Sequence, residues 1–177
     1  MTHAPKFSPT RRTVLALSGA SFLTACGARP QAETVSTASS VSASEIRDWT
    51  SVTDAEWRER LDPMQYYVLR EEGTERAFTS PLNDEKRPGV YHCAACDLAL
   101  FDSSTKYDSG TGWPSFWDYI PGTLDTKPDN KLWIQRTEYH CIRCKGHQGH
   151  VFGDGPRPTG LRYCNNGVAL TFKPRDA

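Results

Sequence analysis

Four of the six cysteines stand in two pairs of identical spacing. Cys93 and Cys96 form one Cys-x-x-Cys pair, and Cys141 and Cys144 form the other. At this spacing a tight turn directs two thiolates at one ion, and four thiolates complete the closed tetrahedral shell of a structural Zn²⁺. We therefore expect one structural zinc ion that joins two distant parts of a single small domain.

The alternative for these cysteines is a pair of disulfides, because the start of the chain is typical of an exported protein and export leads to oxidising surroundings. A disulfide within each pair would close a very small loop and remove little entropy from the unfolded chain. The frame YHCAAC at 91–96 returns as YHCIRC at 139–144, which fits two matched metal-binding turns better. His92 and His140 could replace a cysteine as ligand, but four thiolates already fill the shell.

Cys164 is the one cysteine of the expected domain that is not needed as a metal ligand. If LRYCN at 161–165 is a strand, Arg162, Cys164 and Asn166 point to the same face. A guanidinium beside a thiol favours the reactive thiolate, and an amide can form a hydrogen bond next to the sulfur. A single cysteine is more often a small buried apolar residue, but this polar face favours a nucleophile.

His147 and His150, in the segment HQGH, can change charge near neutral pH and act as general acids. They could also be metal ligands, although the four thiolates need no addition. Asp154 follows His150 by four residues and could orient an imidazole or a water molecule. These residues would form an acid–base group beside the thiol.

The elements that must position these residues are short. A first helix is expected to begin at Thr53, with Glu56 completing its capping box, and a second at Asp62, with Gln65 in the same role and Gly73 at its end. Later in the chain, turn residues separate β-leaning runs such as LWIQRTEY and VALTF. The expected fold is a small, mainly β domain with antiparallel strands and short N-terminal helices.

Several of these segments together resemble the B-type methionine sulfoxide reductases. The resemblance rests on SGTGWPSFW at 109–117, the two Cys-x-x-Cys pairs, HQGHVFGDGPRPTGLRYCNN at 147–166 and VALTF near the C-terminus. It extends from about Trp57 to Phe172. It implies two antiparallel sheets in a barrel-like fold with structural zinc, and reduction of the R epimer of methionine sulfoxide in peptides and proteins.

The resemblance also implies roles for individual residues. Cys164 would be the nucleophile, and Trp113 would pack against the methyl group of the substrate. The polar groups around the nucleophile would be Arg162, Asn166, His147, His150 and Asp154. The thiolate would attack the sulfoxide sulfur while an acid protonates the oxygen, so that methionine leaves and Cys164 becomes a sulfenic acid.

Thr111 stands where many members of that family carry a second, resolving cysteine. A sulfenic acid must be reduced before the next cycle. We therefore expect a cycle that uses one cysteine and an external reductant, either a small thiol or a thioredoxin-like protein. The competing functions are a cysteine hydrolase, for which no oxyanion-hole signature is present, and a zinc-containing binding module, which leaves Arg162, Cys164, Asn166 and Trp113 unexplained.

The first residues are typical of an export signal. Lys6, Arg11 and Arg12 precede an apolar run that starts at Val14, and this run is shorter than the roughly 20 residues that span a bilayer. The Thr10-Arg11-Arg12 start resembles a twin-arginine signal. Removing this segment would take three basic and no acidic residues from a chain with 21 of each. The remainder would be mildly anionic, which argues against nucleic acid as a partner.

Cys26 ends the segment LTAC at 23–26, which resembles a bacterial lipobox whose cysteine is lipid-modified. The alternative is a plain secretory signal in which Cys26 has no role. We expect residues 1–25 to be the export signal, 26–50 a flexible Ser/Thr/Ala-rich tether and 51–177 the folded domain. The expected location is the bacterial periplasm, with a membrane anchor if Cys26 is lipidated, and the expected state is a monomer acting on oxidised proteins.

Overall fold

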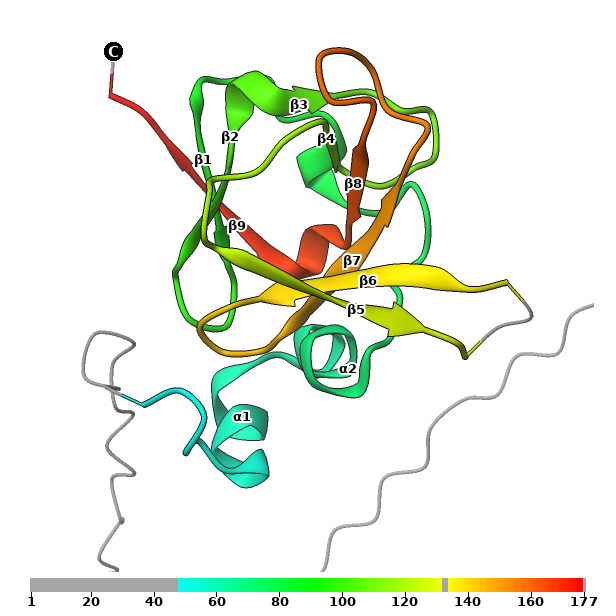
Figure 1. Ribbon diagram of the computed structural model, residues 1–177. Helices are drawn as coiled ribbons and strands as arrows, with labels where there is room; N and C mark the ends of the chain where they lie inside the picture. The colour runs from blue at the N-terminus through cyan, green and yellow to red at the C-terminus, as the bar shows by residue number, and fades with distance from the viewer. Residues whose placement is uncertain (1–47, 132–133, 177) are drawn as a thin grey trace, which may run out of the picture. The chain divides into compact units, whose positions relative to one another are not determined.

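The fold consists of two antiparallel sheets with two short helices beside them (Figure 1). The computed structural model describes residues 48–131 and 134–176. One sheet has the strand order β2-β1-β9 and the other the order β3-β4-β8-β7-β6-β5. The strands are β1 (Gly89–Cys93), β2 (Ala99–Asp102), β3 (Lys106–Tyr107), β4 (Ser115–Phe116), β5 (Leu124–Asp129), β6 (Arg136–Cys141), β7 (His147–Phe152), β8 (Arg162–Asn165) and β9 (Leu170–Pro174). The expected fold class is confirmed.

The two helices begin where the capping residues predicted. Helix α1 (Asp54–Arg60) has Thr53 and Glu56 in a capping box, and α2 (Pro63–Glu71) has Asp62 and Gln65 in a second one. Such boxes satisfy backbone N–H groups that the first turn of a helix leaves without partners. The expected end of α2 was wrong by one residue, because Glu72 and not Gly73 adopts the left-handed conformation (φ 55°).

The region around the helices contains buried aromatic side chains. Trp49 stacks on Trp57 of α1 with ring centroids 5.9 Å apart, and both are buried. Trp49 therefore packs with the first helix of the fold. The Arg70 guanidinium of α2 donates to the Cys144 carbonyl oxygen at 2.9 Å, which ties this helix to the loop between β6 and β7.

An aromatic cluster joins the two sheets. Phe101 of β2 stacks on Phe116 of β4 at 4.2 Å, and Phe101 also meets Tyr139 of β6 and Tyr163 of β8 edge-on or tilted. Side chains of this size dominate the energetics of a small core. Because Tyr163 points into this cluster, its neighbours Arg162 and Cys164 point to the opposite face of β8.

Two expected strands differ in their bounds. The β-leaning run LWIQRTEY at 132–139 enters β6 from Arg136 onward, and residues 132–133 lie outside the described residues. The run VALTF was also expected to be a strand, but a 3₁₀ turn, η3 (Gly167–Ala169), precedes β9. Two further 3₁₀ turns are η1 (Pro81–Asn83) and η2 (Ser103–Thr105).

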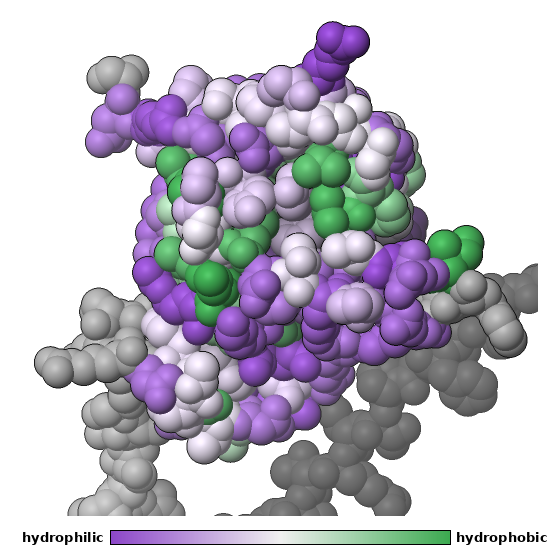
Figure 2. All heavy atoms as spheres, in the orientation of Figure 1, coloured by the Kyte–Doolittle hydropathy of each residue, from purple (hydrophilic) through white to green (hydrophobic). Residues whose placement is uncertain are grey.

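The β5–β6 hairpin forms the open edge of the larger sheet. The four central residues of β5 are exposed, and hydrophilic residues predominate over this hairpin on the face drawn in Figure 2. Charged residues and Pro128 suit an edge strand, because they prevent further strands from pairing with it. Among the described residues, no helix is long and apolar enough to pass through a membrane. The expected export signal, Cys26 and most of the tether lie outside the described residues.

Candidate active site

Cys164 lies in a row of side chains that crosses the larger sheet. In the strand register, Cys164 of β8 is opposite Ser115 of β4 on one side and His150 of β7 on the other. His150 is in turn opposite Glu138 of β6. Residues directly opposite each other in antiparallel strands project to the same face. The sheet therefore brings a thiol, a hydroxyl and an imidazole together from three separate strands.

A β-bulge places both histidines of HQGH on this face. Residues three apart on a regular strand point to opposite faces. Here Gly149 is opposite Tyr139 and His147 is opposite His140, so Gln148 is the extra residue of a bulge. The ring centroids of His147 and His150 consequently lie 5.4 Å apart. His147 is 2% exposed and its Nδ1 lies 3.2 Å from a Glu138 carboxylate oxygen, so it forms a buried layer behind the pocket.

Gly149 is required at the point where β7 meets β8. A Cβ atom added there would overlap the Cys164 carbonyl oxygen and would lie 3.0 Å from the carbonyl carbon. No side chain therefore fits between the bulge and the strand that carries the thiol. This close approach sets the distance between His150 and Cys164.

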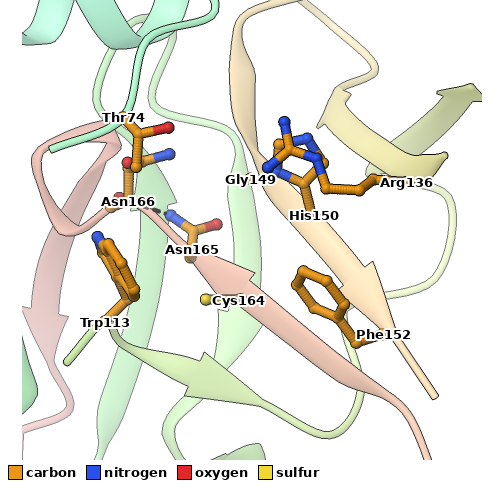
Figure 3. Close-up of a pocket in the computed structure, with 9 residues that line it drawn as sticks. All are labelled: Thr74, Trp113, Arg136, Gly149, His150, Phe152, Cys164, Asn165 and Asn166. Atoms are coloured by element: carbon orange, nitrogen blue, oxygen red, sulfur yellow. Dashed lines mark hydrogen bonds between the residues drawn. The ribbon is translucent and has the colours of Figure 1, made fainter. Parts of the chain in front are cut away.

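A cavity of about 110 Å³ opens over Cys164 (Figure 3). In Figure 3 the sulfur lies between the rings of Trp113 and Phe152, and His150 and Arg136 lie together at another side of the cavity. The full lining is Thr74, Trp113, Arg136, Gly149, His150, Phe152, Cys164, Asn165 and Asn166. A small cavity with aromatic walls and a polar side can hold a short apolar group that carries one polar atom.

Trp113 and Asn166 are held by the segment that follows α2. The Trp113 indole N–H donates to the Glu75 carbonyl oxygen at 3.1 Å, and the Glu75 N–H donates to Asn166 Oδ1 at 3.0 Å. Asn166 Nδ2 donates to the Gln148 carbonyl oxygen at 3.0 Å. Asn166 was expected to form a hydrogen bond beside the sulfur, but it lies beyond the end of β8 and its amide binds backbone instead.

The charges around Cys164 act in opposite directions on its pKa. Burial raises the pKa of the thiol above its ordinary value, while the charge of Arg162 and hydrogen bonds from Thr111, Arg162 and Ser115 lower it. Burial is the larger effect. Arg162 thus favours the thiolate as expected, but its effect is smaller than that of burial and the pKa of Cys164 stays above the ordinary value.

Asp154 orients Arg162. The carboxylate receives two hydrogen bonds from the guanidinium, each 2.8 Å long. The Arg162 guanidinium carbon also lies 4.3 Å from the centre of the Phe152 ring. Asp154 was expected to orient an imidazole or a water; the side chain that it binds in the structure is Arg162 and not a histidine.

Asp129 and Arg136 are the members of the site that sequence reasoning missed. Asp129 Oδ2 lies 2.7 Å from His150 Nε2 and 2.6 Å from an Arg136 guanidinium nitrogen. Burial lowers the pKa of His150, and the hydrogen bond to Asp129 partly opposes this. Asp129 was interpreted as a turn residue, and only its position opposite Arg136 across the β5–β6 hairpin reveals the contact. No local pattern signals it.

Three hydroxyl groups lie beside the thiol on the side away from the histidines. The Ser109 hydroxyl is 2.8 Å from those of Thr111 and Ser115, and Ser115 is fully buried. Thr111 also helps to lower the pKa of the Cys164 thiol. These hydroxyls can stabilise a charged or oxidised sulfur.

The four paired cysteines converge at one buried point. Their sulfur atoms all lie within 4.8 Å of one another, and the shortest separations join the two pairs: 3.6 Å from Cys93 to Cys144 and 3.5 Å from Cys96 to Cys141. Sulfur atoms around a tetrahedral Zn²⁺ at about 2.3 Å are roughly 3.8 Å apart. All four are free cysteines, so disulfides within the pairs are not formed here. The cluster fits a single metal ion.

Comparisons with known proteins agree on one family. A family model described as "SelR domain" matches residues 61–174. The chain is 58% identical over 123 residues to "Peptide methionine sulfoxide reductase MsrB" of Pseudomonas putida (strain W619), which covers 68% of this chain and 92% of that protein. A protein of the same name from Agrobacterium fabrum is 53% identical over 69% of this chain and 91% of its own length.

A plant relative matches over a smaller share of its length. "Peptide methionine sulfoxide reductase B1, chloroplastic" of Oryza sativa subsp. japonica is 54% identical over 125 residues, which is 70% of this chain and 58% of that protein. Among solved structures, the "Yippee-like" domain of Mis18 covers 51% of this chain with 18% identity and a TM-score of 0.40, which is too distant to bear on function.

Proposed function

This chain belongs to the SelR family, and on that premise we propose that it reduces the R epimer of methionine sulfoxide in peptides and proteins. The observation that carries the proposal is the thiol of Cys164 between the rings of Trp113 and Phe152, in the same row of the sheet as His150. This arrangement offers a nucleophile, an apolar cradle and a proton carrier at one point.

The cavity explains how the substrate would be held. The methyl group of the sulfoxide packs against the Trp113 ring, whose indole N–H is fixed by Glu75. The sulfoxide oxygen points to the polar side formed by His150 and Arg136. The two epimers differ in that the oxygen and the lone pair on the sulfur have interchanged positions. Only one of them can therefore place its methyl group on the ring and its oxygen on the polar side.

Cys164 supplies the electrons for the reduction of the sulfoxide, and His150 carries the proton. His150, whose pKa is lowered by burial, acts in its neutral form and takes the proton of the Cys164 thiol. The thiolate attacks the sulfoxide sulfur while the imidazolium returns the proton to the sulfoxide oxygen. The protonated oxygen then passes from the methionine sulfur to the Cys164 sulfur, so that the sulfur–sulfur bond and the S–O bond of the substrate break, a sulfenic acid forms on Cys164 and methionine leaves. The cysteine sulfur is thereby oxidised by two electrons and the methionine sulfur reduced by two.

The second half of the cycle needs an external thiol. One thiol attacks the sulfenic acid, which releases water and leaves a mixed disulfide on Cys164. A second thiol then releases Cys164 and carries away the disulfide. Thr111 occupies the neighbouring position with a hydroxyl, so a small thiol or a thioredoxin-like protein is the proposed reductant.

Zinc is the proposed metal of the cysteine cluster formed by Cys93, Cys96, Cys141 and Cys144. Four thiolates leave it no open position, so it supplies folding stability and takes no part in the reaction. It would join the turn after β1 to the turn after β6. Gln148 donates to Cys93 Sγ at 3.3 Å, so the bulge beside the active site rests directly on this cluster.

Export is the proposed fate of the chain. Residues 1–25 would direct it to the periplasm, and Cys26 would carry the lipid anchor. The support is the basic and apolar order of the segment and the LTAC sequence that ends it. Mass spectrometry of the native N-terminus tests this, and an unmodified Cys26 would contradict the lipid anchor.

The proposed activity is tested with separated epimers. The full chain is incubated with each epimer of a methionine sulfoxide peptide and dithiothreitol, and methionine is measured. We expect turnover of the R epimer only, and none for Cys164→Ser. Turnover of the S epimer, or of either epimer by Cys164→Ser, would contradict the proposal.

A further inference from the structure

Asp129 lies where three strands meet, and both of its carboxylate oxygens have polar partners. It is the last residue of β5 and is 7% exposed. Oδ2 accepts from Arg136 of β6 at 2.6 Å and meets His150 Nε2 of β7 at 2.7 Å. Oδ1 accepts the Lys131 backbone N–H at 2.9 Å. A carboxylate held in this way cannot turn away from the imidazole.

These contacts keep Asp129 charged. Its pKa lies well below the ordinary value, first because of the Lys131 backbone hydrogen bond and then because of His150 and Arg136, although burial acts in the opposite direction. A carboxylate with no proton of its own must accept from His150 Nε2. The neutral imidazole therefore carries its proton on Nε2, and Nδ1 is the ring atom that takes up or releases a proton.

We propose that Asp129 is the positioning residue that fixes the tautomer of His150 and sustains its ability to be protonated during reduction of the sulfoxide. The inference rests on the proposed function, because it concerns the proton that passes between Cys164 and the sulfoxide oxygen. Arg136 holds Asp129 in place from the opposite strand. The role resembles that of any buried carboxylate that orients an imidazole in an acid–base pair.

The pH dependence of the reduction rate is expected to depend on every charged group that faces His150. These groups are Asp129 from β5, Arg136 and Glu138 from β6, His147 from β7 and Cys164 from β8. Arg136 and His147 oppose a positive charge on His150, as does burial, whereas Asp129 supports it. Removing the charge of Asp129 therefore lowers the pKa of His150 further. Protonated His150 is then lost at a lower pH.

The test uses Asp129→Asn, with Asp125→Asn as the matched control. Asp125 lies on the same strand, but its side chain is 56% exposed; it accepts the Thr126 backbone N–H at 2.9 Å and lies near His140 and Lys145. Single-turnover formation of methionine from the R epimer is followed against pH. We expect Asp129→Asn to lower the rate on the order of tenfold with little change in KM, and to move the acidic fall of the profile, where His150 becomes protonated, to lower pH. Asp125→Asn should match the wild-type protein.

A second measurement does not depend on the variant folding. Nitrogen NMR of the wild-type full chain, with His150 assigned by His150→Gln, reports which ring nitrogen carries the proton. We expect Nε2–H at neutral pH. A proton on Nδ1, or an Asp129→Asn pH profile that coincides with that of the control, would overturn the role of Asp129. If the wild-type protein leaves the R epimer unchanged, the proposed function fails instead, and the NMR result still stands by itself.

Discussion

Replacing Gly149 by alanine should displace the strand that carries Cys164. The new Cβ would overlap the Cys164 carbonyl oxygen and lie 3.0 Å from its carbon and 3.2 Å from Asn165 Cα. Because the overlap with the Cys164 carbonyl oxygen is the most severe contact, β7 and β8 must part by more than about 1 Å to restore ordinary van der Waals separations. We expect a loss of about 1–3 kcal/mol in the free energy of unfolding, as for other overpacked sites.

The effect on activity should exceed the effect on stability. The separation of β7 and β8 sets the position of His150 relative to Cys164. A displacement of about 1 Å in a reacting group can reduce a rate by on the order of 10²-fold. Single-turnover reduction of the R epimer and thermal unfolding should be measured together, and the rate should fall by about that factor while the protein remains folded.

Gly153→Ala is the matched control for this prediction. Gly153 directly follows β7, and an added Cβ there meets nothing within 4 Å. Its rate and unfolding temperature should equal those of the wild-type protein. If Gly149→Ala reduces the sulfoxide as fast as Gly153→Ala, the close approach of β7 and β8 does not position the thiol and the reasoning is wrong.

Three further predictions concern the reductant, the thiol and the metal. Thr111→Cys should form a disulfide with Cys164 after one turnover, because the side chain at 111 already contacts the sulfur; mass spectrometry that finds no such bond would contradict that geometry. Arg162→Gln should raise the pKa of Cys164, because a cation that favours the thiolate is removed. Alkylation by iodoacetamide should then accelerate at a higher pH than in the wild-type protein. Arg157→Gln, at an exposed site, is the control and should leave the pH dependence of alkylation unchanged. Strong chelators at raised temperature should release close to one zinc per chain and lower the unfolding temperature; a protein without metal that unfolds at the same temperature would contradict a structural zinc.

Features that depend on neighbouring residues could be predicted from the sequence. The capping boxes at Thr53 and Asp62 follow from residues three apart, and both helices begin there. The two Cys-x-x-Cys turns have a fixed local geometry, and their meeting at one point confirms the expected cluster. The alternation around Cys164 also holds, because β8 is a regular strand between Arg162 and Asn165.

Features that depend on strand register could not be predicted in the same way. The bulge at Gln148 moves His147 to the face of His150, and it is visible only in the pairing of β6 with β7. Asp154 was matched with an imidazole by its distance along the chain, but β7–β8 pairing brings Arg162 to it. Asp129 reaches His150 only because the β5–β6 and β6–β7 hairpins place three strands side by side in one sheet.

Trapping the oxidised thiol is the most direct test of whether Cys164 takes up the sulfoxide oxygen as a sulfenic acid. The protein is given one equivalent of R-sulfoxide peptide without reductant, treated with dimedone, and digested for mass spectrometry. The account predicts one dimedone adduct on Cys164 for each methionine formed. Methionine formed while Cys164 remains unmodified would contradict it.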